Sequence, residues 1–484
     1  MNAAYTTIPQ TVFAESSHQA QSFLYFQHRW LNGLAMALGD TLALCLALLT
    51  AGTIRFLWLG EMLLPGWSWL LIPVWWCGAA LAGLLPSWGL GPVEELRRLT
   101  VLLLALFGGT AVALFLTKEF EGVSRFTVPS ALCVCLVAVP LIRLRVKKIL
   151  IAFGIWGLPT VVYGAGKTGR QVVQFLLREK GLGYMPIGVF DDNPDYWGTT
   201  LEDVRVLGGT DIVMLNTPVA VLAMPGVDRD RLIELLEGPL AQYRKVLVIP
   251  DLLGAPSLWV RPRDLDGMLG LEIKSNLMSP LARLAKRTVD ILVVLLLLPL
   301  LVPLCALCVL FVWLEDRRNP FFLQERVGTA GRLFKALKLR TMVPEAEAVL
   351  RRKLDEDPAL RQEWEAHYKL KNDPRLTRAG RLLRRFSLDE LPQLLNVLRG
   401  EMSLVGPRPL PRYHYGTLPH RVRELRARVR PGVTGLWQVS GRSDIGTEGM
   451  ERWDVYYVRN WSLWLDAVVL FRTGRAVLEG GGAY

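Results

Sequence analysis

The stretch KRTVDILVVLLLLPLLVPLCALCVLFVWL, residues 286–314, decides how the chain is organised. Its apolar run, Val289–Leu314, is long enough to cross a hydrocarbon core of about 30 Å. Pro299 lies in the middle of the run, where a proline breaks or kinks a helix. Basic residues flank both ends: Lys286, Arg287, Arg317 and Arg318. We therefore predict a re-entrant membrane helix, residues 284–314, that enters and leaves the membrane on the same face and breaks at Pro299.

The composition also indicates a membrane protein. Of the 484 residues, 51% are hydrophobic, and the formal net charge is +12. A basic chain binds nucleic acid, anionic lipid or a phosphorylated substrate. Apolar runs of membrane length favour the last two partners, and the chain has no zinc-finger spacing that would support the first.

Four more apolar segments precede this run, and they predict a four-helix transmembrane domain over residues 1–150. The segments are Leu31–Leu59, Trp67–Leu85, Leu99–Leu116 and Val128–Leu144. Lys and Arg residues gather in the second loop and after the fourth segment. The positive-inside rule then places the N-terminus and everything after Lys148 in the cytoplasm.

Residues 151–275 have a different pattern, that of a Rossmann-like α/β module. A buried strand, Pro159–Tyr163, leads into the loop Gly164-Ala165-Gly166-Lys167-Thr168-Gly169. A helical run and a second strand ending at Asp191 follow, which is the order of a dinucleotide-binding unit. Asp191 is a candidate for a ribose contact. The alternative is a fold kept as a structural or regulatory module without a catalytic dinucleotide.

The last part, residues 276–484, contains the most informative stretch, RRFSLDELPQLLNVLRGEMSLVGPRP at 384–409. Ser387 and Glu390 have the spacing of a helix capping box. Asp389 and Glu390 also lie close to several arginines, which suits phosphoryl chemistry. One carboxylate can attack phosphorus while the other holds Mg²⁺.

From about Leu281 onward the chain resembles the polyprenyl-phosphate phosphoglycosyl transferases, or bacterial sugar transferases. The resemblance rests on seven ordered motifs, which include Lys286-Arg287-x-x-Asp290, Gln324-Glu325-Arg326-Val327-Gly328, Lys338-Leu339-Arg340-Thr341-Met342, the Asp389-Glu390 stretch, Pro407-Arg408-Pro409, the run Arg430–Arg442 and Asp454-x-x-Tyr457. The preceding domains and the charged insertion at residues 355–374 resemble the long, galactose phosphotransferase members of the family.

The resemblance implies a role for each matched residue. Asp389 would be the catalytic nucleophile and Glu390 the ligand of an Mg²⁺ cofactor. The expected substrate and phosphate contacts are Arg384, Arg408, Gln438, Arg442, Asp454, Lys338 and Arg340. The implied fold is membrane α plus α/β: four transmembrane helices, the Rossmann-like module, and a mostly helical catalytic domain with the re-entrant helix.

The expected reaction transfers hexose 1-phosphate from a UDP-sugar to undecaprenyl phosphate at the cytoplasmic face of the bacterial plasma membrane. Galactose is the expected hexose, with glucose as the alternative. We expect a UDP-hexose, undecaprenyl phosphate, anionic lipid and a second copy of the chain as partners, and no nucleic acid. Two other classes stay open: a membrane nucleotide-sugar dehydratase, although Tyr163 and Lys167 lie in the wrong place for its catalytic pair, and a non-enzymatic scaffold for polysaccharide assembly.

Overall fold

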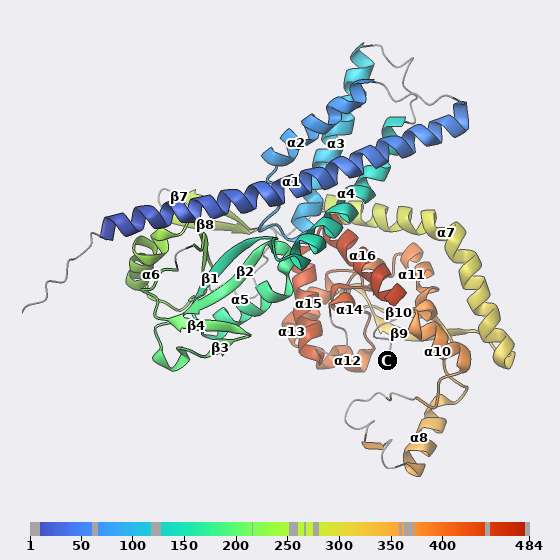
Figure 1. Ribbon diagram of the computed structural model, residues 1–484. Helices are drawn as coiled ribbons and strands as arrows, with labels where there is room; N and C mark the ends of the chain where they lie inside the picture. Colours follow the sequence, from blue (N-terminus) through green and yellow to red (C-terminus); the bar gives the residue numbers. More distant parts are fainter. Residues whose placement is uncertain are drawn as a thin grey trace, which may run out of the picture. The chain divides into compact units, whose positions relative to one another are not determined.

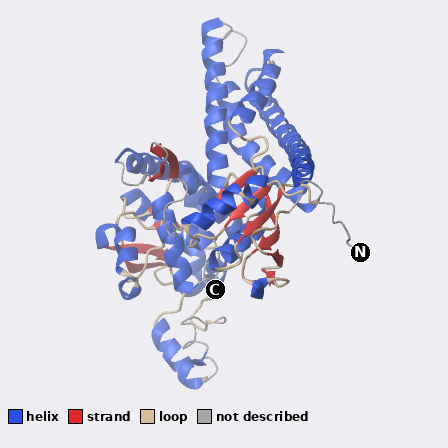
Figure 2. Cartoon of the chain, turned by 90° about the vertical axis from the view of Figure 1, so that its left-hand side faces the viewer, coloured by secondary structure: helices blue, strands red, loops and turns tan. Residues whose placement is uncertain are grey.

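A computed structural model describes residues 10–60, 66–117, 127–214, 216–250, 260–265, 268–273, 280–357, 361–362, 370, 373–440 and 446–479 (Figure 1). The chain divides into two compact units, Met1–Leu252 and Leu253–Tyr484. Helices account for most of the described residues (Figure 2).

Four helical segments are long and apolar enough to cross a membrane, which agrees with the membrane protein expected from composition. Three belong to the first unit and one to the second: Tyr25–Trp58 of α1 (Gln10–Leu59), Pro92–Leu116 of α3 (Pro92–Thr117), Thr127–Ala152, which is α4, and Pro280–Asp316, which is α7. The second predicted segment forms a 3₁₀ turn, Gly66–Leu70, and the short helix α2 (Leu71–Leu81). With 11 residues, α2 is shorter than the roughly 20 residues that span a hydrocarbon core.

A buried network of charges joins the helices of the first unit. Arg143 on α4 donates to Asp40 on α1 at 2.7 and 2.5 Å and to Glu95 on α3 at 3.3 Å. Lys147 donates to Glu95 at 2.6 Å, and the Trp75 indole N–H donates to Asp40 at 2.9 Å. Two positive and two negative charges therefore neutralise one another, as buried ionisable groups in membrane helices generally must.

The α/β part of the first unit is a six-stranded sheet in the order β3-β4-β2-β1-β5-β6. The strands are β1 (Leu158–Tyr163), β2 (Tyr184–Phe190), β3 (Thr200–Leu201), β4 (Val204–Gly208), β5 (Val219–Leu222) and β6 (Lys245–Val248). All neighbouring pairs are parallel except β3 with β4. Two helices follow strands in the chain, α5 (Lys167–Arg178) and α6 (Arg229–Glu237).

The helical and α/β parts of this unit are joined by hydrogen bonds at the chain segment before β1. Asn32 of α1 is fully buried, and its amide donates to the Ile155 carbonyl at 2.8 Å and accepts from the Gly157 N–H at 3.0 Å. These bonds make the two parts of the unit one packed body.

The second unit places α7 and two small sheets around the stretch at residues 384–409. Strands β9 (Phe321–Val327) and β10 (Leu333–Leu339) pair antiparallel, and β11 (Ser403–Val405) pairs with β12 (Gly432–Thr434). A hairpin, β7 (Val260–Leu265) with β8 (Met268–Ile273), also belongs to it. The other helices are α8 (Ala346–Glu356), α10 (Arg378–Arg385), α11 (Gln393–Arg399), α12 (Arg412–Thr417), α13 (His420–Ala427), α14 (Leu436–Val439), α15 (Gly446–Asn460) and α16 (Leu463–Glu479).

Candidate active site

The two acidic residues lie in a short 3₁₀ turn, Leu388–Glu390, between α10 and α11. Ser387 before the turn has a left-handed backbone, with φ of 54°, and its side chain makes no capping bond. The predicted capping box is therefore wrong, because a left-handed Ser387 does not have the extended backbone that such a cap needs. The turn instead directs Asp389 and Glu390 toward strand β10 and the loop after β11.

Glu390 is held by two cations. Its Oε1 accepts hydrogen bonds from Lys338 Nζ at 2.7 Å and from Arg408 Nη2 at 3.2 Å. Burial alone would raise the pKa of this carboxyl, but Arg408 and Lys338 outweigh burial and lower the pKa to about 2. Glu390 is therefore an anion at any physiological pH.

Asp389 is 9% exposed and has a different electrostatic balance. Burial raises its pKa and the neighbouring Glu390 charge adds to the effect, while Lys338, Arg384 and Arg408 oppose it. The result is a pKa above the ordinary value of an aspartate. A more basic carboxylate is a better nucleophile, provided that it is ionised at the working pH.

The predicted phosphate-binding residues divide into two groups in this unit. Lys338 and Arg408 contact Glu390, and Arg384 lies close enough to Asp389 to affect its charge, while its Nε donates to Thr341 Oγ1 at 3.0 Å. Arg340 instead donates to Asp316 Oδ1 at 2.5 Å, at the end of α7. The structure brings Lys338, Arg384 and Arg408 to the carboxylates, and it pairs Arg340 with the helix α7.

A small polar pocket lies among these groups, with a volume of about 10 Å³, the space of one water molecule. Its charged lining groups are Arg326, Lys338, Arg408 and Glu390. Three cations against one carboxylate leave an excess of positive charge. This excess suits a phosphorylated ligand.

An apolar groove of about 440 Å³ begins next to the same carboxylates. One wall is the second half of α7, from Leu298 to Trp313, and the other is formed by Leu391, Pro392 and the apolar residues of α11. Leu391 follows Glu390 directly in the chain. Glu390 lines the cationic pocket and the next residue, Leu391, lines the apolar groove.

Both ends of α7 are attached to the second unit. At its start, Lys286 donates to Asp466 at 2.6 Å, and Arg287 donates to the carbonyls of Val397 and Leu398 at 2.5 and 2.8 Å. At its end, Glu315 accepts from the N–H groups of Arg378 and Ala379 at 2.8 and 3.1 Å. Lys286 is therefore buried in an ion pair and is not available to lipid head groups.

The middle of α7 contains Pro299, the residue of the predicted break, and also Pro303. The helix is continuous from Pro280 to Asp316, with Pro299 and Pro303 inside it. Its ribbon bends sharply along its length (Figure 1). The part of α7 before Pro299 contains Lys286 and Asp290. The part from Leu298 to Trp313 forms one wall of the apolar groove.

Of the three remaining predicted contacts, the structure describes two, Asp454 and Gln438. Asp454 is 2% exposed and forms an ion pair with Arg426; burial raises the pKa of its carboxyl to about 6 although Arg426 opposes this. Gln438 donates to the Val433 carbonyl at 3.4 Å. Arg442 falls outside the described residues.

Two arginines at the site were not among the predicted contacts. Arg326 stood in a quoted motif but had no role, and it lines the polar pocket. Arg426 lies in α13, one of several arginine-dense helices, so its spacing alone did not distinguish it. The signal that identifies both is the bonds they make to the loop at Pro407–Leu410.

Within the described residues, no group of three or more His, Cys, Asp or Glu side chains is arranged to hold a metal ion. A magnesium ion needs fewer protein ligands, because it is usually bound by one or two carboxylates together with substrate phosphates. Asp389 and Glu390 fit that requirement, with Glu390 Oε1 already engaged by its two cations.

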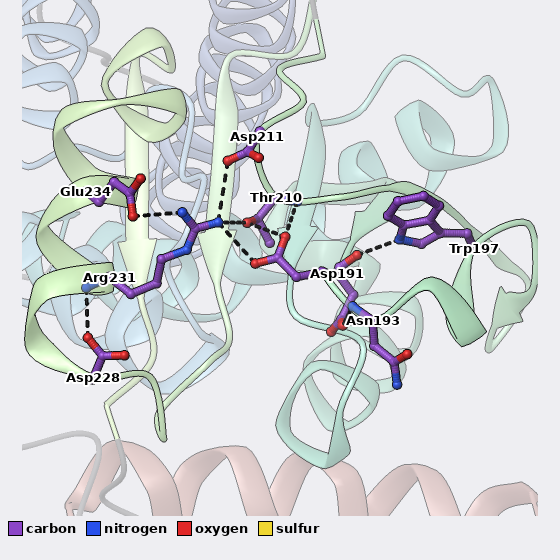
Figure 3. Close-up of polar contacts among 9 residues, drawn as sticks. Asp191, Asn193, Trp197, Thr210, Asp211, Asp228, Arg231 and Glu234 are labelled. Atoms are coloured by element: carbon purple, nitrogen blue, oxygen red, sulfur yellow. Dashed lines mark hydrogen bonds and ion pairs between the residues drawn. The ribbon is translucent and has the colours of Figure 1, made fainter.

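The glycine loop of the first unit follows β1 and requires glycine at two of its positions. Gly164 has φ of 109°, and a Cβ on Gly169 would lie 1.8 Å from the Gly164 carbonyl oxygen, so neither position admits a side chain. Asp191, the expected ribose contact, accepts from the Ala165 N–H at 2.6 Å. Beside it, Arg231 bonds to Asp192, Thr210, Asp211 and Glu234 (Figure 3).

Comparison with known proteins gives consistent matches. Residues 281–480 match the bacterial sugar transferase family. The chain is 38% identical to the UDP-galactose-lipid carrier transferase of Erwinia amylovora over 72% of this chain and 73% of that protein. It is 34% identical to the undecaprenyl-phosphate galactose phosphotransferase of Salmonella typhimurium over 81% and 82%. It is 31% identical to the UDP-glucose:undecaprenyl-phosphate glucose-1-phosphate transferase of Escherichia coli over 64% and 66%.

Proposed function

Because the chain belongs to the bacterial sugar transferase family, we propose that it transfers hexose 1-phosphate from a UDP-sugar to undecaprenyl phosphate, with galactose as the hexose. Two galactose-named relatives support this sugar, since they match more of this chain at higher identity than the glucose-named relative from Escherichia coli. The observation that carries the proposal is the pair Asp389 and Glu390, which are buried beside the cations Lys338 and Arg408.

The reaction has two displacement steps at the same phosphorus. In the first, a carboxylate oxygen of Asp389 attacks the phosphorus that carries the sugar, the bond to the bridging oxygen breaks, and UMP leaves with that oxygen. In the second, a phosphate oxygen of undecaprenyl phosphate attacks the acyl phosphate and releases the Asp389 carboxylate. The product is undecaprenyl-diphospho-sugar.

The cations at the site have a defined task in both steps. Lys338 and Arg408 bond to Glu390 before substrate arrives, and Arg384 lies near enough to Asp389 to lower its pKa. A diphosphate brings negative charge toward an anionic nucleophile, so these three cations reduce the repulsion that opposes attack. Their fixed positions also orient the phosphorus toward Asp389.

We further propose Mg²⁺ as the cofactor, with Glu390 as its protein ligand. The ion would neutralise diphosphate charge during transfer. We expect EDTA to abolish UMP release and added Mg²⁺ to restore it, measured on the purified protein in detergent. Full activity in EDTA would contradict the metal assignment.

The lipid substrate has an apolar tail that needs a binding surface. Two residues of the groove lining, Leu391 and Pro392, come directly after Glu390 in the chain. An isoprenoid chain in the groove would place its phosphate head at Asp389. This arrangement supports a lipid-linked acceptor rather than a soluble one.

We propose that α7 is the re-entrant helix. Helix α11 contacts both parts of it: the carbonyls of Val397 and Leu398 bind Arg287, and Leu395 and Leu398 line the groove with Leu298–Trp313. A helix crossing the bilayer would separate its ends by about 30 Å of hydrocarbon. Helix α11 has seven residues and is about 10 Å long, so it cannot reach both ends of a crossing helix. A bent α7 brings both of its parts within reach of α11.

The rest of the proposal concerns the whole protein. The N-terminal helices anchor it in the bacterial plasma membrane, with the catalytic unit on the cytoplasmic face. The α/β module is Rossmann-like, supported by the central place of β1 between β2 and β5 and by the glycine loop after β1. Anionic lipid and a second copy of the chain, as a homodimer, stay predicted partners.

The test of the proposed chemistry is Asp389→Asn. This variant keeps the shape of the side chain but replaces the carboxylate by a neutral amide, which is a poor nucleophile. We expect wild type to release UMP from UDP-galactose faster than from UDP-glucose, and to form a covalent phospho-sugar adduct visible by mass spectrometry of the intact protein. The variant should lose the adduct and at least about 1000-fold in turnover, a typical cost of removing a nucleophile. An adduct that persists in the variant would move the nucleophile to another residue.

A further inference from the structure

The loop that presents Arg408 to Glu390 is held at every peptide carbonyl. From Pro407 to Leu410, the four successive carbonyl oxygens accept hydrogen bonds from the Gly432 N–H, Arg426, Arg326 and the Val327 N–H. The proline rings on either side of Arg408 also restrict the backbone. Such a loop has little freedom, so the direction of the Arg408 side chain is set by its neighbours.

The bond to the Arg408 carbonyl itself comes from a buried side chain. Arg426 is 7% exposed, and its guanidinium donates to this carbonyl with Nη2 and to Asp454 with Nη1. Arg426 comes from α13 and Asp454 from α15, so two helices fix the position of one guanidinium. Asp454 is buried by this pairing and is turned to Arg426 rather than to the polar pocket.

We propose that Asp454 and Arg426 are positioning residues that aim Arg408 at the phosphate, and that neither touches the substrate. The inference rests on the proposed function, which makes Arg408 a phosphate ligand. Asp454 fixes the Arg426 fork, Arg426 fixes the Arg408 peptide, and Arg408 points to the space where the diphosphate would bind. The family resemblance placed Asp454 among the substrate contacts. In this proposal it acts indirectly, through Arg426 and Arg408.

The test is a double-mutant cycle between Asp454→Asn and Arg408→Ala. If Asp454 acts through Arg408, Asp454→Asn should lower kcat/KM for UMP release by about 100-fold in the otherwise wild-type chain. The reason is that a displacement of a binding group by about 1 Å lowers the rate by about that factor. In the Arg408→Ala background the same change should cost less than about threefold. An equal loss in both backgrounds would overturn the proposal, because Asp454 would then act without Arg408; full activity of Asp454→Asn would overturn it as well.

Two measurements keep the outcome clear. Arg421→Gln, an exposed arginine on the same helix α13, is the matched control and should keep wild-type kinetics. Arg426→Lys keeps the positive charge but cannot bond to Asp454 and to the Arg408 carbonyl at the same time. If Asp454→Asn shows no cooperative melting and is therefore not folded, Arg426→Lys replaces it in the double-mutant cycle. The cycle is repeated on the Kd of UDP by calorimetry. If the two substitutions are coupled in their effect on the Kd of UDP but wild type releases no UMP, only the proposed function is overturned. If wild type has normal turnover but the effects of the two substitutions on Kd are additive, only the positioning role is overturned.

Discussion

The ionisation of Glu390 makes the stability of the catalytic unit depend on pH. Its pKa is about 2 in the folded chain against an ordinary value of 4.5, so its contribution is complete above pH 4.5 and is lost as the pH falls toward 2. Protonation of Glu390 should lower the free energy of unfolding of wild type by about 2 kcal/mol between pH 7 and pH 3. Glu390→Gln lacks that titration. We therefore expect the variant to melt below wild type at pH 7 and the gap in Tm to narrow toward pH 3, by differential scanning fluorimetry. A gap that stays constant with pH would contradict the assignment, and Glu347→Gln, on the surface helix α8, is the control that should not alter the profile.

At the same scale, the sequence predicted the residues whose chemistry is visible in a motif, and it missed those defined by packing. Asp389, Glu390 and Arg408 stand in short ordered motifs, and the structure brings them together. Asp454 also stands in a motif, yet its ion pair with Arg426 depends on how α13 and α15 pack. Nothing in the local sequence distinguishes Arg426 from the other arginines of α13.

The topology of α7 is a prediction at the scale of the element. Single cysteines at positions 280 and 318, in a chain without its native cysteines, should both be protected from a membrane-impermeant maleimide in intact cells and react once the membrane is opened. The reason is that both ends of α7 bind the same catalytic unit. A cysteine at position 60, in the expected outer loop, is the matched control and should react in intact cells. Labelling at position 318 in intact cells would mean a true crossing and would remove Asp389 from the cytoplasmic side.

Elements with a strong local pattern were predicted well, and elements that depend on tertiary contacts were not. The strand, glycine loop, helix and second strand near residues 158–190 appear as β1, α5 and β2. The second apolar segment, Trp67–Leu85, contains only the short helix α2. Hydropathy depends on composition alone, so it does not predict the turns near Gly83 and Pro86 that follow this helix. The predicted capping box at Ser387 was also wrong, since Ser387 has a left-handed backbone that the spacing of Ser387 and Glu390 does not reveal.

At the scale of the molecule, we expect the first unit to be dispensable for chemistry. The family match begins at residue 281, and every contact described at the carboxylates comes from the second unit. Deleting Met1–Gly270 should therefore leave measurable UMP release from UDP-galactose in detergent. Circular dichroism establishes whether the remainder folds, and Asp389→Asn in the same truncated chain is the control for background. A folded truncation without activity would mean that the deleted residues, which include β7 of the second unit, contribute to the site.

The division of the molecule was only partly visible in the sequence. Composition distinguished membrane segments from the glycine-loop region, but the structure joins both into one compact unit, Met1–Leu252. The bonds of Asn32 to Ile155 and Gly157 explain this union, and they link residues more than 120 positions apart. Pairings at that separation have no local signature.

The buried charges of the N-terminal helices also set an order of events while the chain is being made. Asp40 is synthesised 103 residues before Arg143, its guanidinium partner. At a translation rate of about 5–20 residues per second, the ribosome needs roughly 5–20 s to cover that interval. During this time α1 carries a carboxylate without its partner, and a charge in a membrane helix costs about 3 kcal/mol on insertion scales. The first helix therefore gains its final stability in the bilayer only when the fourth has been delivered beside it.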